Sequence, residues 1–447
     1  MKKFNIFYFE RFEFDRSTLK AFFYYHFDNK EFFVEEIDFN NISIDSELDN
    51  DTVKNYLFQI HLALWISYYK LFPTKELRVE SWYLDNDQLS FWKKFYLNWL
   101  GEFFITNDID PKWLLCFKNI FYRNTFLVKQ QEKNPINEHK NLLLFWWWKD
   151  SIVSYSLIKN TDFDLFVFWK LDRIKEEASK VIWQTPLLVK RKISDNLFRL
   201  NKLWYYNGHV PITWIIAFVS LFYAYLFWYK NIILSNEKSS SEENTIWKWI
   251  KINHQYSKSF EFERGLSSYI DKYILTDIKY FSLLRWMYEY KISELFSKET
   301  EFFQNFSSCN KNFSILWKKQ NKNWCSRCSK CVFVFLILSN FIGVDDLKRF
   351  FWENLFDIPE LEDIFWELIW LKNHKPFECV WTIEESSFSF FNALKKYNNA
   401  YYYILEKFKD SMIEQWKYKD VKKVEDKLLK ISDDDIIPME FKDFLKK

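Results

Sequence analysis

The stretch Leu144-Phe145-Trp146-Trp147-Trp148-Lys149-Asp150-Ser151 decides how this chain is expected to fold. It connects an apolar run at 141–145, which predicts a buried strand, to a run at 151–159 that predicts a helix. Three consecutive tryptophans are unexpected in such a turn, because tight connections favour glycine and small polar residues. Asp-Ser before a helix is also an ordinary capping pair, so the turn alone assigns no function.

Strands and helices continue to alternate after this turn. Strands are predicted at 163–168 and 231–234, and helices at 173–180 and 212–228. This alternation implies an α/β fold with a doubly wound parallel sheet, whose ligands bind at the carboxyl ends of the strands.

The chain divides into three predicted regions. We expect an α+β N-terminal domain at 1–135, an α/β domain at 136–345 and a helical region at 346–447. A helix is predicted near 53–71 in the N-terminal region, and the polar stretch 130–140 is typical of a linker.

Net charge and hydrophobic content argue against nucleic acid and membrane as partners of this chain. The 447 residues are 49% hydrophobic and carry a formal net charge of +2, so no large basic field favours nucleic acid. The uncharged run 210–229 is long enough to suggest a membrane helix, but it contains Pro211 and polar residues and leads into a predicted strand. A buried helix is the preferred interpretation, and we expect a cytoplasmic protein without a membrane partner.

The glycine and tryptophan contents are both abnormal. There are 4 glycines and 23 tryptophans, and the two together make up about 6% of the chain, close to the usual share of glycine alone. We interpret many of the tryptophans as glycines mistranslated from UGA codons, which some bacterial lineages read as glycine. The alternative is a genuinely Trp-rich protein, such as a carbohydrate binder; Trp92 and Trp324 are candidates for authentic tryptophans.

With glycine at Trp146, Trp147 and Trp148, the turn resembles the PP-loop of ATP pyrophosphatases, S-G-G-x-D-S, although Phe145 replaces the first serine. Glycines let backbone N–H groups face phosphate oxygens, and the N-terminus of the following helix favours negative charge. Lys149 would add a positive charge, Asp150 would hold Mg²⁺ or the loop, and Ser151 would donate a hydroxyl. As translated, with indoles in the phosphate site, the protein is predicted to be inactive.

Four further strings carry a more specific resemblance. They are Asn207-Gly-His-Val-Pro-Ile-Thr213, Ser235-Asn-Glu-Lys-Ser-Ser-Ser-Glu242, Asn253-His-Gln-Tyr-Ser-Lys-Ser259 and His374-Lys-Pro-Phe-Glu-Cys-Val-Trp-Thr382. In this order they resemble the PP-loop epimerase family that inverts the terminal glutamate of UDP-N-acetylmuramoyl-L-alanyl-L-glutamate (UDP-MurNAc-L-Ala-L-Glu). The resemblance covers roughly residues 140–385, with a weaker match at 98–102.

The resemblance implies an ATP- and Mg²⁺-dependent epimerase of peptidoglycan precursor synthesis. ATP would adenylylate the α-carboxylate, a base would remove the acidified α-proton, and hydrolysis would release the D-glutamate product and AMP. The enzyme would act after a ligase that adds L-Glu to UDP-MurNAc-L-Ala. The acid/base candidates are His254, Tyr256, Lys258, Glu378 and Cys379. The substrate-binding candidates are Asn207, His209, Asn236, Glu237, Ser239, Glu242 and Lys375.

These candidates have structural alternatives. His254 would also suit a helix cap, Glu378 would also pair with Lys375, and a cysteine such as Cys379 is as often buried as reactive. Glu237 and Glu242 would also fit a solvated loop.

Four cysteines are spaced as metal ligands. Cys325, Cys328 and Cys331 form a C-x2-C-x2-C cluster, with Cys309 upstream, which is a reasonable thiolate site for structural Zn²⁺. A redox pair and plain buried thiols are the alternatives, whereas a disulfide framework is not expected in a cytoplasmic chain of this size.

Two other functions compete with the epimerase. One is a PP-loop enzyme that adenylylates a nucleobase or tRNA, as in 7-cyano-7-deazaguanine synthesis; the near-neutral charge argues against tRNA. The other is a non-enzymatic Trp-rich binding protein, which requires every tryptophan to be real.

Overall fold

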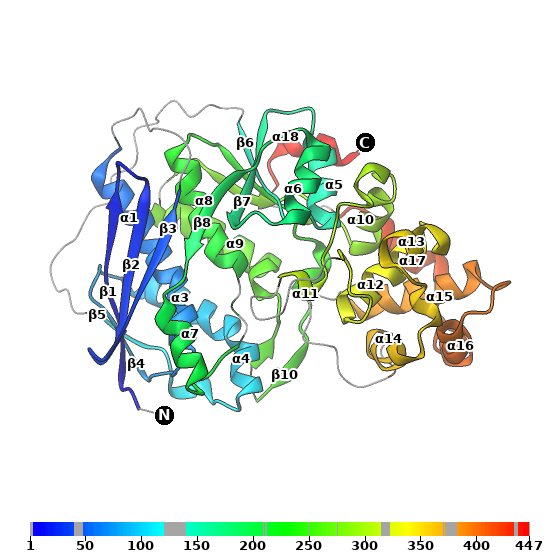
Figure 1. Ribbon diagram of the computed structural model, residues 1–447, viewed down its shortest axis with the longest axis horizontal. Helices are drawn as coiled ribbons and strands as arrows, with labels where there is room; N and C mark the ends of the chain where they lie inside the picture. The colour runs from blue at the N-terminus through cyan, green and yellow to red at the C-terminus, as the bar shows by residue number, and fades with distance from the viewer. Residues whose placement is uncertain are drawn as a thin grey trace.

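A ten-stranded mixed sheet forms the centre of the protein. The computed structural model describes residues 3–39, 48–119, 140–208, 210, 212–248, 250–274, 276–313, 322–369, 371, 382–432 and 437–446. The strands of the sheet lie in the order β12-β9-β6-β7-β8-β3-β2-β1-β4-β5 (Figure 1). Their bounds are β1 (Ile6–Asp15), β2 (Lys20–Phe27), β3 (Glu31–Asp38), β4 (Glu76–Val79), β5 (Cys116–Asn119), β6 (Asn141–Leu144), β7 (Phe163–Trp169), β8 (Leu187–Lys192), β9 (Asn231–Leu234) and β12 (Lys279–Ser282). A separate antiparallel pair is made by β10 (Thr245–Trp247) and β11 (Ile250–Ile252).

The five strands from β12 to β8 are all parallel, with β6 in the middle. From β6 the chain moves through β7 to β8 on one side, and later through β9 to β12 on the other. The strand order therefore reverses between β6 and β9. In doubly wound sheets, ligands bind in the crevice that this reversal opens at the carboxyl ends of the two strands.

The N-terminal strands extend the same sheet. β1, β2 and β3 form an antiparallel meander, β3 pairs antiparallel with β8, and β4 and β5 continue in parallel beyond β1. Most pairings in the whole sheet are parallel. The regions expected at 1–135 and 136–345 are thus joined through one sheet by the β3–β8 ladder.

Helices cover both faces of the parallel strands and gather at the C-terminal end of the chain. They are α1 (Asn50–Leu64), α2 (Ile66–Tyr69), α3 (Asn86–Trp99), α4 (Gly101–Thr106), α5 (Lys149–Ile158), α6 (Arg173–Ile182), α7 (Asp195–Lys202), α8 (Ile212–Leu226), α9 (Phe260–Tyr269), α10 (Glu289–Phe296), α11 (Asn310–Phe313), α12 (Ser329–Leu338), α13 (Val344–Phe351), α14 (Glu362–Leu368), α15 (Ile383–Lys396), α16 (Tyr403–Trp416), α17 (Val421–Leu429) and α18 (Met439–Lys442). Figure 1 shows α12 to α17 grouped at the end of the molecule opposite β1 to β5.

Alternate residues of the parallel strands pack into two different hydrophobic cores, one on each face of the sheet. Leu142 and Ile232 pack in the core that includes α1 and α8. Leu143 and Ile233 point the other way, into the core that includes α5, α10 and α12. Because both faces are covered, these strands are apolar on both sides, which explains their continuous hydrophobic runs.

The predicted elements around the tryptophan turn are confirmed. The strands expected at 141–145, 163–168 and 231–234 are β6, β7 and β9, and the helices expected at 151–159, 173–180 and 212–228 are α5, α6 and α8. The helix expected near 53–71 is divided into α1 and α2. Within the uncharged run, residues 212–226 form the buried helix α8. In the described part of the chain, no helix has both the length and the apolar character that a bilayer span requires.

Candidate functional site

The tryptophan turn lies at the point where the strand order reverses. It connects the carboxyl end of β6 to α5, and Trp147 in its middle has a φ of 57°. This left-handed conformation is one that glycine adopts without steric cost. The Trp147 indole is fully buried, and its Nε1 has no hydrogen-bond acceptor among the described residues. At the start of α5, the Ser151 hydroxyl donates to the Trp148 carbonyl at 2.9 Å.

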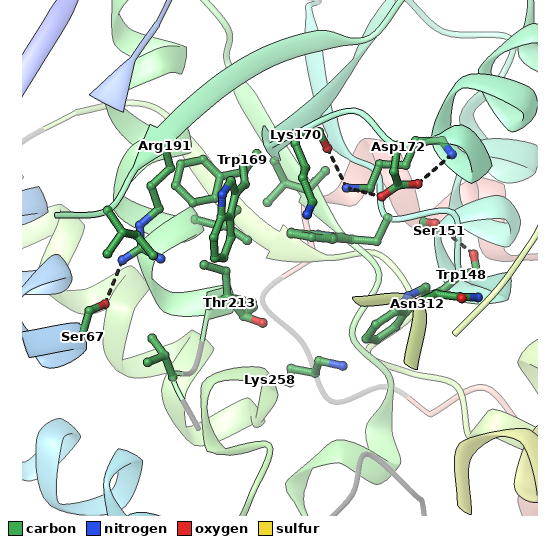
Figure 2. Close-up of a pocket in the computed structure, with 18 of the residues that line it drawn as sticks. Ser67, Trp148, Ser151, Trp169, Lys170, Asp172, Arg191, Thr213, Lys258 and Asn312 are labelled. Atoms are coloured by element: carbon green, nitrogen blue, oxygen red, sulfur yellow. Dashed lines mark hydrogen bonds and ion pairs between the residues drawn. The ribbon is translucent and has the colours of Figure 1, made fainter. Parts of the chain in front are cut away.

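A cavity of about 770 Å³ opens beside this turn (Figure 2). Trp148, Ser151 and Asn312 lie at one end of it, and Lys258 lies on another wall. Ser67 and Arg191 lie at the opposite end. The lining also includes the sequence-predicted residues Trp146, Asp150, Asn207, Asn236 and Glu237.

Buried charges lie next to the turn. The carboxylates of Asp150, Glu237 and Glu289 each have an oxygen within 4.8 Å of the others, and Lys149 contacts both Asp150 and Glu289. Burial, followed by the charge of Asp150, raises the pKa of Glu289 well above its usual range. Burial opposes charge on Lys149, but Asp150 and Glu289 outweigh it and raise the pKa of the lysine. Carboxylate clusters of this kind suit Mg²⁺.

Lysine ammonium groups surround the indoles of the turn. The Nζ of Lys175 lies 5.5 Å from the ring centroid of Trp146, and the Nζ of Lys258 lies 4.5 Å from that of Trp148. Lys330 approaches Trp148 as well, with its Nζ 5.1 Å from the ring. The ammonium groups of these three lysines therefore surround the space that the indoles occupy.

The far end of the cavity carries two more buried cations. Lys70 donates to the Gly208 carbonyl at 2.5 Å and to the Asn207 side chain at 3.3 Å. Burial, followed by the nearby charge of Arg191, lowers the pKa of Lys70 to about 8. Arg191 itself donates to Glu35 at 2.5 Å and to Ser67 at 2.8 Å.

Arg285 links two of the predicted strings. Its guanidinium donates to the carbonyls of Glu237 and Lys258, each at 2.7 Å, and it pairs with the buried Glu263 at 2.5 Å. Sequence reasoning missed Arg285, because its partners are far away along the chain. It also missed Lys70, Lys175, Glu289 and Lys330 as residues that face the site. Glu263, the partner of Arg285, lies four residues after the Asn253–Ser259 string, and this proximity was the available sequence signal for the pair.

Of the remaining candidates, some line a second cavity, His254 contacts Glu102, and the others lie outside the described residues. Ser239, Glu242 and Tyr256 line another cavity of about 770 Å³, together with Arg285. Burial raises the pKa of the Tyr256 phenol. His254 contacts Glu102 through Nδ1. The predicted site residues that lie outside the described part of the chain are His209, Lys375, Glu378 and Cys379.

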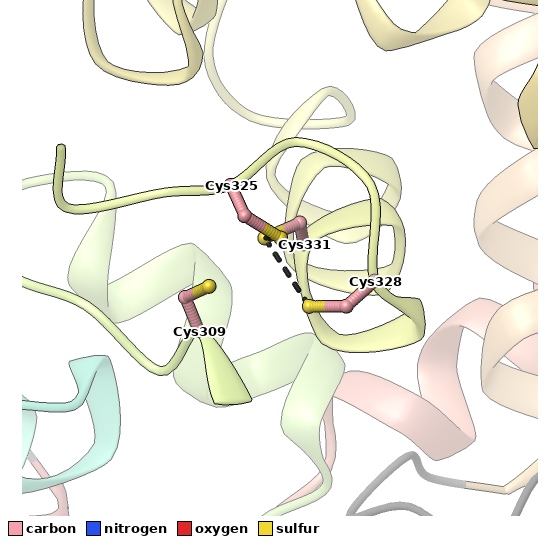
Figure 3. Close-up of side chains that lie close together, drawn as sticks. All are labelled: Cys309, Cys325, Cys328 and Cys331. Atoms are coloured by element: carbon pink, nitrogen blue, oxygen red, sulfur yellow. Dashed lines mark hydrogen bonds between the residues drawn. The ribbon is translucent and has the colours of Figure 1, made fainter. Parts of the chain in front are cut away.

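The four clustered cysteines do come together. The Sγ atoms of Cys309, Cys325, Cys328 and Cys331 lie within 4.8 Å of one another, and none of these cysteines forms a disulfide (Figure 3).

Six tryptophans share the left-handed conformation, and glycines do not. Among the described residues, φ lies between 57° and 85° at Trp147, Trp169, Trp183, Trp204, Trp228 and Trp352. All four glycines of the chain are described, and none has a positive φ. Trp183, Trp204, Trp228 and Trp352 follow the ends of α6, α7, α8 and α13 by one or two residues. This is the position at which helices most often end in a left-handed glycine.

Comparisons with known proteins match nearly the whole chain. Residues 1–283 match the MurL N-terminal domain, and residues 305–423 match the MurL C-terminal domain. A UDP-N-acetyl-alpha-D-muramoyl-L-alanyl-L-glutamate epimerase of Xanthomonas oryzae is 30% identical over 339 residues, covering 75% of this chain and 73% of that protein. A protein of the same name from Salinispora tropica is 35% identical over 240 residues, covering 53% of this chain and 52% of that protein.

Proposed function

We propose, because this chain belongs to the MurL family, that it inverts the α-carbon of the terminal glutamate in UDP-MurNAc-L-Ala-L-Glu to give the D-glutamate product. The names of the relatives support this reaction over nucleobase or tRNA modification. The observation within the chain that carries the proposal is the convergence of the turn, buried carboxylates and lysines at the strand reversal.

The chemistry requires activation of the substrate. The α-proton of an amino acid is weakly acidic beside a carboxylate, because its removal creates a carbanion next to a group that is already negatively charged. We propose that the α-carboxylate attacks the α-phosphorus of ATP, forming an acyl-adenylate and expelling pyrophosphate. A base then removes the acidified proton, a proton returns on the opposite face, and water releases AMP. The strand order around β6 supports a PP-loop type of nucleotide site there.

We propose that the turn binds the pyrophosphate portion of ATP through backbone N–H groups. This requires small residues at Trp146, Trp147 and Trp148, because the indoles fill the space beside the backbone. The left-handed φ of Trp147 supports glycine in the native protein. With the indoles absent, Lys175 and Lys330 would face the phosphates, where cations stabilise the leaving group.

We extend the glycine proposal to the six left-handed tryptophans. An L-residue in this conformation costs about 1–2 kcal/mol, so it is improbable that six tryptophans were selected for it. Trp92 behaves differently: it is buried, and its Nε1 donates to the Tyr269 hydroxyl at 3.1 Å. Peptide mass spectrometry of the protein from its native source would reveal glycine at the six positions and tryptophan at Trp92. Tryptophan at all seven would reject the proposal.

Asp150, Glu237 and Glu289 fit a magnesium ion. They are buried oxygen donors in the segments that follow β6, β9 and β12, with Asp150 and Glu289 at the starts of α5 and α10, and Oε1 of Glu289 has no partner among the described residues. When bound, Mg²⁺ would neutralise charge that develops on the phosphates. The three carboxylates would hold the ion beside the turn, and Lys149 would orient Asp150 and Glu289 through its contacts with both.

Lys258 is the described acid/base candidate that lies nearest to the proposed reaction. It lines the cavity that contains the turn, and Arg285 fixes its backbone carbonyl. Tyr256 lines the second cavity, and His254 is engaged with Glu102. We therefore propose Lys258 as one proton-transfer group, with Glu378 or Cys379 as candidates for the other.

The substrate places the enzyme in a reaction sequence. A ligase that adds L-glutamate to UDP-MurNAc-L-Ala must act first, because this reaction consumes its product. Both UDP-linked precursors and ATP are cytoplasmic metabolites, so we propose that location.

The direct test is an assay of the chain with glycine at positions 146–148. UDP-MurNAc-L-Ala-L-Glu, ATP and Mg²⁺ should yield the D-glutamyl product and AMP. Lys258→Gln should reduce the rate by 10²-fold or more, the usual range for loss of an acid/base group. Lys279→Gln, at an exposed site on β12, is the matched control and should retain activity. Absence of D-glutamate from the folded glycine form would reject the proposed function.

A further inference from the structure

The four cysteines form a site with the dimensions of a tetrahedral metal centre. The Sγ of Cys331 lies 3.6 Å from that of Cys325 and 3.4 Å from that of Cys328. A zinc ion with Zn–S bonds of about 2.3 Å requires sulfur atoms about 3.8 Å apart, so little movement is needed. Figure 3 shows the four side chains converging from three segments of the chain.

The local backbone favours thiolates at this position. Cys328 is the N-cap of the ten-residue helix α12, and Cys331 lies in its first turn. Free N–H groups and the positive end of the helix dipole stabilise negative sulfur there. Plain core thiols need neither this placement nor four converging sulfur atoms. We propose that Cys309, Cys325, Cys328 and Cys331 bind one Zn²⁺.

This metal centre also connects to the nucleotide turn through Cys309. Two residues before it, the backbone N–H of Ser307 donates to the Trp147 carbonyl at 3.2 Å. Three residues after it, Asn312 lines the cavity and donates from Nδ2 to the Ser307 hydroxyl at 3.2 Å. Fixing the sulfur of Cys309 therefore restrains a segment that contacts both the turn and the cavity.

A second connection runs through Lys330. This lysine lies between Cys328 and Cys331 and is only 3% exposed, and its Nζ faces the turn at Trp148. Two flanking metal ligands would restrain the helix turn that carries it. The zinc centre would thus hold the segments that carry Lys330 and Asn312 in place against the turn. This coupling rests on the proposed ATP site, whereas metal binding itself does not.

The first experiment measures metal on the full-length chain. Elemental analysis should give one zinc per chain, and Co²⁺ replacement should produce thiolate-to-metal charge-transfer absorption. Cys325→Ser and Cys328→Ser, at half-buried positions, should abolish both signals, whereas Cys116→Ser in β5 should retain them. The cobalt spectrum of the unsubstituted chain keeps the test valid if a serine variant fails to fold. No stoichiometric zinc and no cobalt–thiolate absorption would overturn the metal centre.

The second experiment measures the coupling by calorimetric binding of ATP with Mg²⁺ to the chain with glycine at 146–148. Removal of zinc, or Lys330→Gln with zinc retained, should weaken binding at least tenfold. Lys348→Gln, on the exposed side of α13, should change neither metal content nor affinity. Unchanged ATP affinity in the zinc-free and Lys330→Gln proteins would refute the coupling between the zinc centre and the ATP site. Zinc-loaded protein that makes no D-glutamate would support the metal centre and count against the proposed function.

Discussion

Replacing exposed left-handed tryptophans by glycine should stabilise this protein. Trp183, Trp204 and Trp352 have φ values of 59°, 63° and 69°, and their exposed fractions are 94%, 87% and 61%. Their indoles therefore contribute little burial, while each Cβ carries the steric penalty of the left-handed region. At Trp352, the Lys322 Nζ lies 5.1 Å from the ring centroid.

The expected gain follows from these values. Relief of the left-handed penalty contributes about 1–2 kcal/mol per site. The greater backbone freedom of glycine in the unfolded chain offsets up to about 1 kcal/mol, and loss of the exposed cation–π contact costs about 0.5 kcal/mol. A net gain of about 2 kcal/mol for the triple variant is reasonable, because distant sites usually add. With an unfolding entropy of about 2.1 cal/mol/K per residue, 447 residues give a Tm increase of about 2 °C.

The assay is differential scanning calorimetry of three proteins: the parent, the triple glycine variant and the matched triple alanine variant. Alanine removes the same indoles but keeps the Cβ, so it should not reproduce the gain. An alanine variant as stable as the glycine variant would show that indole exposure, and not backbone strain, is responsible. A glycine variant that melts below the parent would refute the strain argument altogether.

Three further predictions concern the interior. Glycine at positions 146–148 should create ATP binding that the translated chain lacks, and alanine at the same positions should bind at least tenfold more weakly, as measured by calorimetry. Arg285→Met should destabilise the fold by about 3 kcal/mol in urea titrations, because it leaves Glu263 buried and unpaired, and adding Glu263→Met should restore part of the loss. Burial lowers the pKa of Lys70 to about 8, so binding of the anionic substrate should weaken about tenfold from pH 7 to 9, and Lys70→Met should remove this dependence. The unfolded chain keeps this proton up to about pH 10.4, so the contribution of Lys70 should make the folded state more stable as the pH rises from 8 to 10.

Local patterns were sufficient to predict the elements around the site. The strand–turn–helix at 141–159 follows from an apolar run, a turn and a capping pair, all within a few residues. The spacing of Cys325, Cys328 and Cys331 likewise anticipated that their sulfur atoms would meet. The tryptophan excess was visible in composition, but composition does not distinguish one tryptophan from another. The left-handed φ values separate six of them from a hydrogen-bonded one such as Trp92.

The sequence by itself determined that a turn with an anomalous composition separates a buried strand from a helix, and it placed four family strings in order behind that turn. Only the tertiary structure decided which residues face it. Lys330 and Glu289 reach the turn from more than 130 positions away, and the β3–β8 ladder brings the N-terminal strands into the same sheet. Hydrophobic periodicity reports the burial of one element at a time. Contacts between residues far apart in the chain depend on how the helices of both cores pack against the sheet. Local sequence patterns do not predict that packing.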